Sequence, residues 1–427
     1  MPGRLMHRIA LGLYNLAYPV GVALTFPYVI YKLGTVPKYR AGLSQKLGFE
    51  LPEPLPHSRR VWFHGVSVGE TLAIAPLVEE FKRRHPQVGV YYSVTTHTGM
   101  EIALKRLSGV ADAVFYFPFD FYPVVWKVVS RTAPSAVVIA ETEIWPSFVE
   151  VCRSRNVPLF MVNARVSPSS FNGYMRIRWF MRPVLEAYRY IFARSPLDAA
   201  RLVQLGAPQD RVKVTGNIKF YSVLLRSKSV SPDRVREDLG LGSFPLWVCG
   251  STHRGEEEIL LEAYRMVLEQ VPELRLAVVP RHPERFREVE ELIRAKGFNL
   301  GLRSRRDALA DHQVLLVDTM GELFSLYSVA QVVFVGGSLV EVGGHNPLEP
   351  LVFGVPTAIG PHHFNFADVM EEVGEFVEVV EDAGQLASFV LEVLKGQCPF
   401  SRERVLERFS EAGRAVDEVL RALEEVL

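Results

Sequence analysis

Short apolar runs rich in β-branched and aromatic residues alternate with amphipathic stretches from residue 59 onward. In the first half of the chain these runs lie at 61–64, 88–94, 113–117, 136–140, 158–162 and 190–193. The segments between them, such as 71–85, place apolar residues three or four positions apart, which is the spacing of an amphipathic helix. Strands that alternate with helices predict a parallel sheet with helices on both faces.

A second series of the same kind begins near residue 222. Its predicted strands are 246–250, 274–280, 313–317, 332–336 and 355–359, and its predicted helices are 255–269, 284–296 and 321–329. The polar stretch 227–233 indicates the entry to this second domain. After residue 400 an amphipathic helix follows, which we interpret as a structural cover. The pattern therefore predicts an α/β protein with two Rossmann-like, doubly wound domains that face a cleft.

The N-terminal segment differs from the rest. Residues 9–31 carry no charge, and a stretch of 23 residues is long enough to span a bilayer with some tilt. Pro19 and Pro27 interrupt it. Cations flank it on both sides, with more after it than before it: Arg4, Arg8, Lys32, Lys38, Arg40 and Lys46. This asymmetry predicts that the globular part lies in the cytoplasm. Three interpretations stay open: a spanning anchor, a kinked hairpin in one leaflet, and a pair of buried core helices.

Length, charge and cysteine spacing limit the classes of function that the chain can have. The 427 residues, 48% of them apolar, suggest about two well-packed domains. The 48 basic and 48 acidic side chains balance, so the basic excess typical of nucleic-acid binding is missing, whereas local cations still suffice for an anionic ligand. Cys152, Cys249 and Cys398 are far apart and form no C-x-x-C pair, which predicts reduced thiols.

Ligands of such sheets bind at the carboxyl ends of the strands, so the loops there carry the candidate chemistry. The stretch HGVSVGE, from His64 to Glu70, follows a predicted strand and enters a helix. The Glu70 carboxylate is a candidate to accept a proton from a hydroxyl. The alternative is a first-turn glutamate that only favours the helix dipole. Since a helix N-terminus lowers a carboxylate's pKa, burial must raise the pKa of Glu70 if it is a base.

Two further loops of the first half hold charged candidates. In AETEIWP, from Ala140 to Pro146, Glu141 and Glu143 alternate, so only one faces the cleft if the chain stays extended. Without a D-x-D triplet or a nearby histidine, these carboxylates are a weak candidate for a metal site. In VTGNIKF, Lys219 is a cation beside a Gly-Asn turn, or else a solvated lysine.

The second half offers several anion-binding loops. We expect Gly250, Ser251 and Thr252 to present backbone N–H groups as an anion cradle. Arg281 ends a strand, and arginine suits bidentate recognition of phosphate or carboxylate. The stretch DTMGELF at 318–324 is another strand-to-helix turn.

The glycine-rich stretch VGGSLVEVGGHNPLEP at 335–350 is the most informative loop. Asn346, Pro347 and Glu349 fit the N-cap, N1 and N3 positions of a helix, which is a complete local explanation. The functional alternative is that Glu349 accepts hydrogen bonds from ribose hydroxyls. His345, taken alone, is most simply a turn residue.

Six of these stretches, HGVSVGE, ETEIWP, TGNIKF, PRHPER, MGELF and GGHNPLEP, occur in an order that resembles the bacterial, lipid A-specific Kdo (3-deoxy-D-manno-octulosonic acid) transferase family. The resemblance runs over about residues 10 to 380. It implies a GT-B fold with a membrane anchor, and inverting, metal-independent transfer of Kdo from CMP-Kdo to a lipid A precursor (lipid IVA) at the inner membrane. No cofactor is implied.

The resemblance also assigns roles. By it, Glu70 is the general base, and Glu141 and Lys219 stabilise the transition state. The implied CMP contacts are Pro280, Arg281, Met320, Gly321, Glu322, Asn346, Pro347, Leu348 and Glu349. The implied domains are an anchor segment at 1–45, an acceptor domain at 46–222, a CMP-Kdo-binding domain at 223–405 and a covering helix at 406–427.

Other functions remain compatible with the fold pattern. One alternative is another GT-B nucleotide-sugar transferase or a sugar-nucleotide epimerase, because architecture alone does not determine activity. The other is a membrane-tethered, lipid-binding scaffold without turnover.

Overall fold

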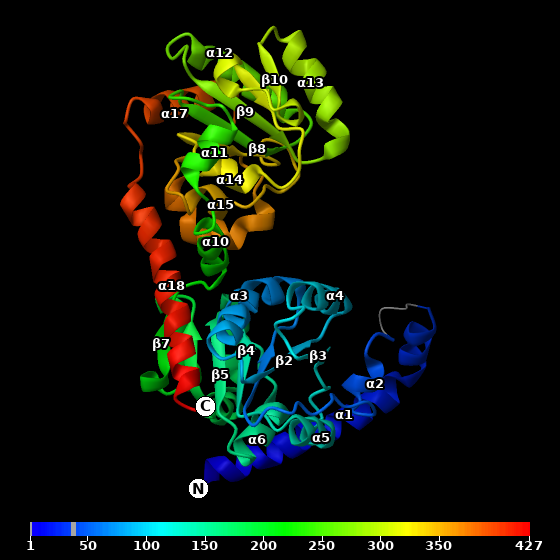
Figure 1. The fold of residues 1–427 in the computed structure, drawn as a ribbon. Coiled ribbons are helices and arrows are strands. Elements are labelled where there is room, and N and C mark those ends of the chain that lie inside the picture. Colours follow the sequence, from blue (N-terminus) through cyan, green and yellow to red (C-terminus); the bar gives the residue numbers. More distant parts are fainter. Residues whose placement is uncertain (1, 36–39) are drawn as a thin grey trace. The chain divides into compact units, whose positions relative to one another are not determined.

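The structure, a computed structural model, describes residues 2–35 and 40–427 and contains two parallel seven-stranded sheets (Figure 1). The chain forms two compact units. Unit 1 comprises Met1–Ser222 with Glu411–Leu427, and unit 2 comprises Val223–Ser410.

The sheet of unit 1 has the strand order β3-β2-β1-β4-β5-β6-β7. Its strands are β1 (Arg60–His64), β2 (Gly89–Val94), β3 (Ala113–Tyr116), β4 (Ala136–Ala140), β5 (Leu159–Ala164), β6 (Tyr188–Ala193) and β7 (Val212–Val214). Its helices are α2 (Leu43–Lys46), α3 (Val68–Arg84), α4 (His97–Arg106), α5 (Tyr122–Thr132), α6 (Pro146–Ser154), α7 (Pro168–Arg176), α8 (Arg178–Leu185) and α9 (Pro196–Leu205). The central strand β1 pairs Phe63 with Tyr92 of β2 and with Val138 of β4, and all three side chains are fully buried. Helices on both faces explain why these strands read as continuous apolar runs.

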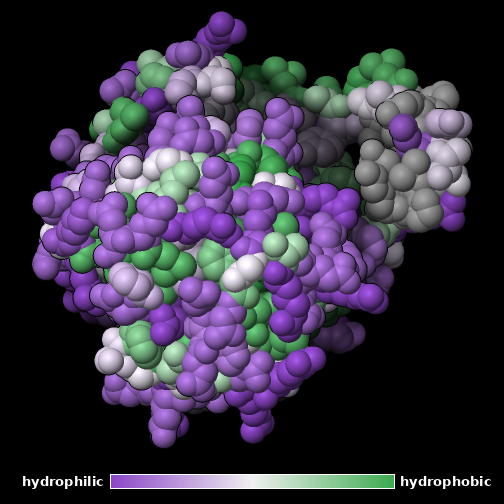
Figure 2. All heavy atoms as spheres, turned by 90° about the horizontal axis from the view of Figure 1, so that it is seen from above, coloured by the Kyte–Doolittle hydropathy of each residue, from purple (hydrophilic) through white to green (hydrophobic). Residues whose placement is uncertain are grey.

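The sheet of unit 2 has the order β10-β11-β9-β8-β12-β13-β14. Its strands are β8 (Leu246–Thr252), β9 (Arg275–Pro280), β10 (Leu300–Leu302), β11 (Val314–Leu316), β12 (Val332–Val335), β13 (Thr357–Ile359) and β14 (Val377–Val379). Its helices are α11 (Pro232–Asp238), α12 (Glu256–Leu268), α13 (Phe286–Ala295), α14 (Leu323–Tyr327), α15 (Leu348–Leu351), α16 (Ala367–Val373) and α17 (Ala383–Leu394). Side chains of α12 and α17 join one core cluster with those of β8 and β9. The face seen in Figure 2, over α12 and α13, is covered mainly by hydrophilic side chains.

Two helices carry the chain between the units: α10 (Lys219–Ser227) and α18 (Arg402–Glu424). The second half of α18 is held on unit 1 by ion pairs, including Lys213 Nζ to Glu418 Oε1 at 2.8 Å and His85 Nε2 to Glu424 Oε1 at 2.9 Å. The covering helix predicted after residue 400 is therefore present, and its C-terminal half belongs to unit 1.

The helix α1 (Pro2–Thr35) is one continuous helix docked along unit 1 (Figure 1). Its inward face includes the buried Leu11 and two polar side chains that bind unit 1. The Tyr14 hydroxyl donates to Asp120 Oδ2 at 3.0 Å, and the Asn15 side chain donates to Ser147 Oγ at 3.0 Å. Asn15 Oδ1 also accepts from the backbone N–H of Tyr122 at 2.7 Å. The hairpin and the buried helix pair expected for this segment are both wrong, because the helix is unbroken and its outward face is exposed.

No helix within the described residues combines the length and the apolar character needed to cross a membrane. The structure thus does not show the spanning anchor expected at 9–31. Lys38, one of the cations expected to flank it, lies outside the described residues.

Candidate functional site

In each sheet the chain order reverses beside one central strand, and ligands of open parallel sheets bind at such reversal points. In unit 1 the reversal lies between β1 and β4, whose carboxyl ends lead to Glu70 and to Glu141. In unit 2 it lies between β8 and β12, which lead to His253 and to His345. The candidate residues of the two units therefore sit at equivalent places in their own sheets.

Glu70 lies in the first turn of α3, and the turn before that helix holds its carboxylate. Ser67 is the N-cap, and its Oγ accepts from the Glu70 backbone N–H at 3.4 Å. In return Glu70 Oε2 accepts from the Val66 N–H at 2.7 Å, and Glu70 Oε1 accepts from Ser67 Oγ–H at 3.1 Å. This reciprocal arrangement resembles a capping box and fixes the carboxylate at the carboxyl end of β1.

Burial decides the ionisation of this carboxylate. Glu70 is only 8% exposed, and burial raises the pKa of its carboxyl to about 7, with the nearby charges of Glu141 and Glu143 acting in the same direction. The hydrogen bonds from Val66 and Ser67 oppose the shift without cancelling it. The expected lowering by the helix N-terminus is thus outweighed, and the group is poised to exchange a proton near neutral pH.

His64, the first residue of the HGVSVGE stretch, is a structural residue. It is fully buried, its ring stacks on Phe117 with centroids 4.0 Å apart, and its Nδ1 lies 2.9 Å from Ser93 Oγ. Burial lowers the pKa of His64 to about 3, so the imidazole is neutral. Its role is to pack beneath the loop, and it carries no charge into the site.

Both glutamates of the ETEIWP stretch lie near Glu70, which corrects the expectation that only one faces the site. The charges of Glu141 and Glu143 each raise the pKa of Glu70. The chain does not stay extended, because Glu141 has φ 56 and so adopts the left-handed conformation directly after β4. Its N–H still donates to Val162 O of β5 at 2.8 Å, which anchors the turn. Alternation along a strand therefore does not apply here.

Lys219 is the first residue of α10, on the same edge of the unit 1 sheet. The turn before it is tied to β5, since the Ile218 N–H donates to Asn163 Oδ1 at 3.2 Å. Asn217 Oδ1 accepts from the Lys219 backbone N–H at 3.1 Å. β5 is the neighbour of β4, so this backbone lies beside the strand that carries Glu141.

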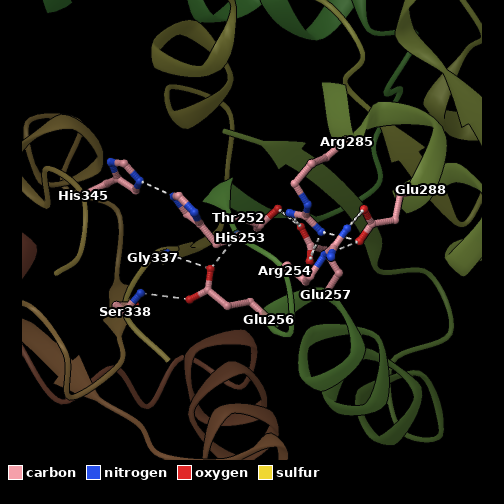
Figure 3. A network of polar contacts seen from close by, with 10 residues as sticks. All are labelled: Thr252, His253, Arg254, Glu256, Glu257, Arg285, Glu288, Gly337, Ser338 and His345. Atoms are coloured by element: carbon pink, nitrogen blue, oxygen red, sulfur yellow. Dashed lines mark hydrogen bonds and ion pairs between the residues drawn. The ribbon is translucent and has the colours of Figure 1, made fainter. Parts of the chain in front are cut away.

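In unit 2 two buried glutamates at the start of α12 organise the loops (Figure 3). Glu256 is fully buried and accepts from the N–H groups of His253, Gly337, Ser338 and Leu339 at 2.7–2.9 Å. Glu257 accepts from the Thr252 hydroxyl at 2.7 Å and from both Arg285 terminal nitrogens at 2.7 and 3.0 Å.

This network overturns the anion cradle expected at Gly250, Ser251 and Thr252. β8 extends through Thr252, so these residues belong to a strand, and the Thr252 hydroxyl is engaged by Glu257. The backbone N–H groups that do converge, those of Gly337 and Ser338, are already bound to Glu256.

Arg281 and Glu349 lie close enough at the carboxyl edge of unit 2 to influence each other. Pro280 ends β9, and the Arg281 backbone N–H donates to Thr252 O at 3.0 Å. Glu349 lies in α15, where burial raises the pKa of its carboxyl while the charges of Arg226 and Arg281 oppose that shift. The Arg226 guanidinium lies 3.3 Å from Glu349 Oε1. Arg226 was missed, because no local pattern marks it.

The capping expected at 346–349 is displaced by one residue. Pro347, not Asn346, is the residue before the first helical turn, and α15 begins at Leu348. Asn346 Oδ1 nevertheless accepts from the Leu348 N–H at 3.1 Å, as a capping side chain does.

The remaining expected CMP contacts, Met320, Gly321 and Glu322, follow β11 at the same edge. Met320 is 62% exposed, and Gly321 has φ 90 with open space around it. Glu322 already accepts from Arg303 Nε at 2.8 Å. The expected segments thus follow β9, β11 and β12 at the same carboxyl end of the sheet. Gly321 has open space around it, whereas Glu322 is already bound within the protein.

Three histidines lie together at the carboxyl end of this sheet. The sequence analysis considered only His345, as a turn residue, and missed the cluster. His253 Nε2 lies 2.9 Å from His345 Nε2, and the His282 ring packs edge-on against His253 at 5.2 Å. Each follows a different strand, so only the fold reveals the cluster.

Residues 41–222 match the family model described as 3-deoxy-D-manno-octulosonic-acid transferase (kdotransferase). The chain is 34% identical to the 3-deoxy-D-manno-octulosonic acid transferase of Haemophilus influenzae, over 86% of this chain and 86% of the relative. It is 33% identical to the enzyme of that name from Chlamydophila psittaci, over 84% of this chain and 81% of the relative.

A solved structure of much lower sequence identity shares the fold. The structure of UDP-GlcNAc 2-epimerase from Neisseria meningitidis superposes with a TM-score of 0.54 at 14% identity, covering 86% of this chain and all of that one. At this identity the likeness concerns the fold alone. Together with the identities above, the ordered sequence blocks and the paired sheets lead to one conclusion: the chain belongs to the 3-deoxy-D-manno-octulosonic acid (Kdo) transferase family of glycosyltransferases.

Proposed function

We propose that this Kdo transferase takes Kdo from CMP-Kdo and adds it to a hydroxyl of a lipid A precursor (lipid IVA), with inversion and without a metal ion. Glu70 acts as the general base. The reaction takes place at the cytoplasmic surface of the inner membrane, as a step of lipopolysaccharide core synthesis.

The state of Glu70 is the observation that carries this proposal. A base that removes a proton from an acceptor hydroxyl works best when its pKa is close to the working pH. Burial raises the pKa of Glu70 to about 7, although its place in a first helical turn favours the ionised form. As the acceptor oxygen bonds to the anomeric carbon of Kdo, its proton passes to Glu70. The bond from that carbon to the phosphate oxygen breaks, and its electron pair leaves with CMP.

Charge at the edge of unit 2 supports the donor assignment. CMP-Kdo carries one phosphate and one sugar carboxylate, so it needs cations and N–H donors. Arg281 follows β9. Glu349 has a largely buried carboxyl that feels the charges of Arg226 and Arg281, and it is suited to accept hydrogen bonds from ribose. Glu141 and Lys219 are proposed to stabilise the transition state, in which charge develops on the transferred sugar and the leaving phosphate.

The exposed face of α1 supports a lipid acceptor. Ile9, Leu13, Leu16, Val20 and Leu24 recur every three or four residues and are 49–78% exposed. The opposite face is bound to unit 1 by hydrogen bonds of Tyr14 and Asn15. A helix whose apolar side points outward while its polar side is docked is suited to lie in the membrane interface.

A basic residue near this helix supports membrane attachment at the same surface. Arg40 follows α1, and cations at that position attract anionic lipid headgroups or acceptor phosphates. We therefore propose an interfacial attachment in place of a spanning anchor, with Arg40 on the lipid-facing side.

Mass spectrometry of the product tests the proposal. The full chain is incubated with CMP-Kdo and a tetra-acylated, bisphosphorylated acceptor in the presence of EDTA, and the acceptor is expected to gain the mass of Kdo. Parallel reactions with UDP-sugars test the alternative transferase and epimerase activities. Conversion of a UDP-sugar with an unchanged lipid acceptor would overturn the assignment.

A further inference from the structure

Two histidines on neighbouring loops of unit 2 hydrogen-bond each other directly. His253 follows β8 and His345 lies between β12 and α15, and their Nε2 atoms are 2.9 Å apart. The ring planes differ by 14° with centroids 5.2 Å apart. In the neutral pair one Nε2 donates and the other accepts, which leaves one Nδ1–H donor. An added proton is shared between the Nε2 atoms, and both Nδ1 atoms then carry hydrogen.

The pair is held in place by a buried carboxylate. Glu256 accepts from the His253 N–H at 2.8 Å and from the Gly337 N–H at 2.7 Å, so it joins the loops that carry the two histidines (Figure 3). The Gly344 N–H then donates to Gly337 O at 2.7 Å, directly before His345. Gly337 has φ 68, and a Cβ there would lie 3.0 Å from the His345 ring, so glycine leaves the room that the imidazoles occupy.

Burial and the surrounding charges both favour the neutral form of the pair. Burial lowers the pKa of His345 to about 4, with His253, Arg281 and His282 acting in the same direction. Burial also lowers the pKa of His253, helped by His282, Arg285 and Arg281 and opposed by Glu257.

The carboxylates nearby already have partners, since Glu256 binds backbone N–H groups and Glu257 binds Arg285. Within the described residues no group of three or more His, Cys, Asp or Glu side chains is placed to hold a metal ion. The pair, with Arg281 and His282 beside it, therefore forms an environment that is complemented by an anion.

We propose that the His253–His345 pair binds an oxyanion of the donor and takes up a proton from solvent as the donor binds. This inference rests on the proposed CMP-Kdo donor and names a part of its site. A phosphate or sugar carboxylate beside the imidazoles favours their protonated form, which then offers two Nδ1–H donors.

The proton has a use in the transfer step. When the bond between the anomeric carbon and the phosphate oxygen breaks, the phosphate gains one negative charge. A protonated pair at that phosphate stabilises the charge as it develops, with no change in the number of protons during the step itself. Because the occupied site holds more protons than the empty one, affinity for CMP falls as pH rises through the pKa of the occupied pair.

Isothermal titration calorimetry of CMP into the full chain tests this. Titrations near neutral pH in two buffers of different ionisation enthalpy give the number of protons taken up. The variants are His253→Asn and His345→Asn, and the matched control is His312→Asn, on a distant loop where His312 Nδ1 lies 2.9 Å from Ala308 O. Comparing variants with wild type cancels the ionisation of CMP itself.

We expect the wild type and His312→Asn to take up about one proton more per CMP than either pair variant. The pair variants should bind CMP about tenfold more weakly, as for the loss of a charge-assisted hydrogen bond. Kdo and cytidine identify the anion: extra uptake with Kdo assigns the sugar carboxylate, and uptake with CMP but not with cytidine assigns the phosphate.

Nitrogen chemical shifts of ¹⁵N-histidine in the wild type give a readout that does not depend on any variant folding. The signals of His253 and His345 should change from neutral to protonated on addition of CMP. If CMP binds and both imidazoles stay neutral, with equal proton uptake in all proteins, the inference is overturned while the donor assignment stands. If CMP does not bind the wild type, the donor assignment fails as well.

Discussion

Replacing Glu70 by glutamine separates the catalytic role of this carboxyl from its effect on stability. The amide is close in shape, and its oxygen can still accept from the Val66 N–H that now lies 2.7 Å from Oε2. It cannot accept a proton. We expect kcat to fall by about 10²-fold or more, the usual range for loss of a general base, while CMP affinity stays nearly unchanged. In the wild type, kcat/KM should rise with pH up to about 7 and then level off.

The same substitution should stabilise the protein at alkaline pH. The folded pKa of about 7 lies above the ordinary value of 4.5, so the folded state binds more protons than the unfolded state between these values. Stability therefore falls as pH rises through this window. At 1.36 kcal/mol per pKa unit, the full cost above pH 7 is about 3 kcal/mol, which Glu70→Gln removes. Below the ordinary pKa both side chains are neutral and the difference disappears.

Thermal unfolding across pH, beside the transferase assay, measures both effects, and Glu80→Gln on the same helix is the matched control. Hydrogen bonds from Arg83, followed by Arg84, lower the pKa of Glu80 to about 2. Its stabilising contribution is present above the ordinary pKa of 4.5 and lost as pH falls toward 2, so Glu80→Gln should lower stability at alkaline pH and leave kcat unchanged. A Glu70→Gln protein that keeps its turnover, or that is less stable than wild type at pH 8, refutes the reasoning.

Three other substitutions test neighbouring parts of the structure. Arg281→Ala should weaken CMP binding about tenfold by calorimetry, as for the loss of a charged hydrogen-bond donor, and unchanged affinity would remove Arg281 from the donor site. Tyr14→Phe removes the 3.0 Å hydrogen bond to Asp120. It should lower the free energy of unfolding by about 1 kcal/mol and make proteolysis within α1 faster. Equal stability would mean that this bond does not hold the helix. Leu16→Glu, on the exposed face of α1, should reduce flotation with anionic vesicles while kcat on a detergent-dispersed acceptor is retained, and full flotation would exclude that face as the attachment surface.

The sequence pattern predicted the inner strands and the edge strand β3, but it missed the other three edge strands. Every strand predicted from 61–64 to 355–359 is present, with ends shifted by at most two residues. The strands β7, β10 and β14 were missed, and each is a three-residue strand at an edge of its sheet. Sequences such as VKV and VEV are too short and too polar to show a period, because an edge strand needs only one paired neighbour.

The position of a candidate residue was predictable where a loop directly follows a strand, and unpredictable where distant loops meet. Glu70 and Arg281 were placed at the carboxyl ends of strands because each lies just beyond an apolar run. Glu256 was not, since its partners are Gly337 and Ser338, about eighty residues later. Local reasoning assigned backbone donors to an anionic ligand, but the protein supplies its own carboxylate. Only tertiary structure reveals which loops adjoin.

The three carboxylates at the reversal point of the unit 1 sheet are an arrangement that folding alone does not favour. Glu70 is buried with a raised pKa, and Glu141 and Glu143 raise it further by repulsion. Glu141 also adopts a left-handed backbone conformation, which costs about 1–3 kcal/mol in a residue other than glycine. A neutral side chain in place of Glu70 would remove the cost of burying a charge and the repulsion. A glycine in place of Glu141 would remove the backbone strain. Burial and the repulsion from Glu141 and Glu143 both make Glu70 a stronger base, which is what the proposed proton transfer requires.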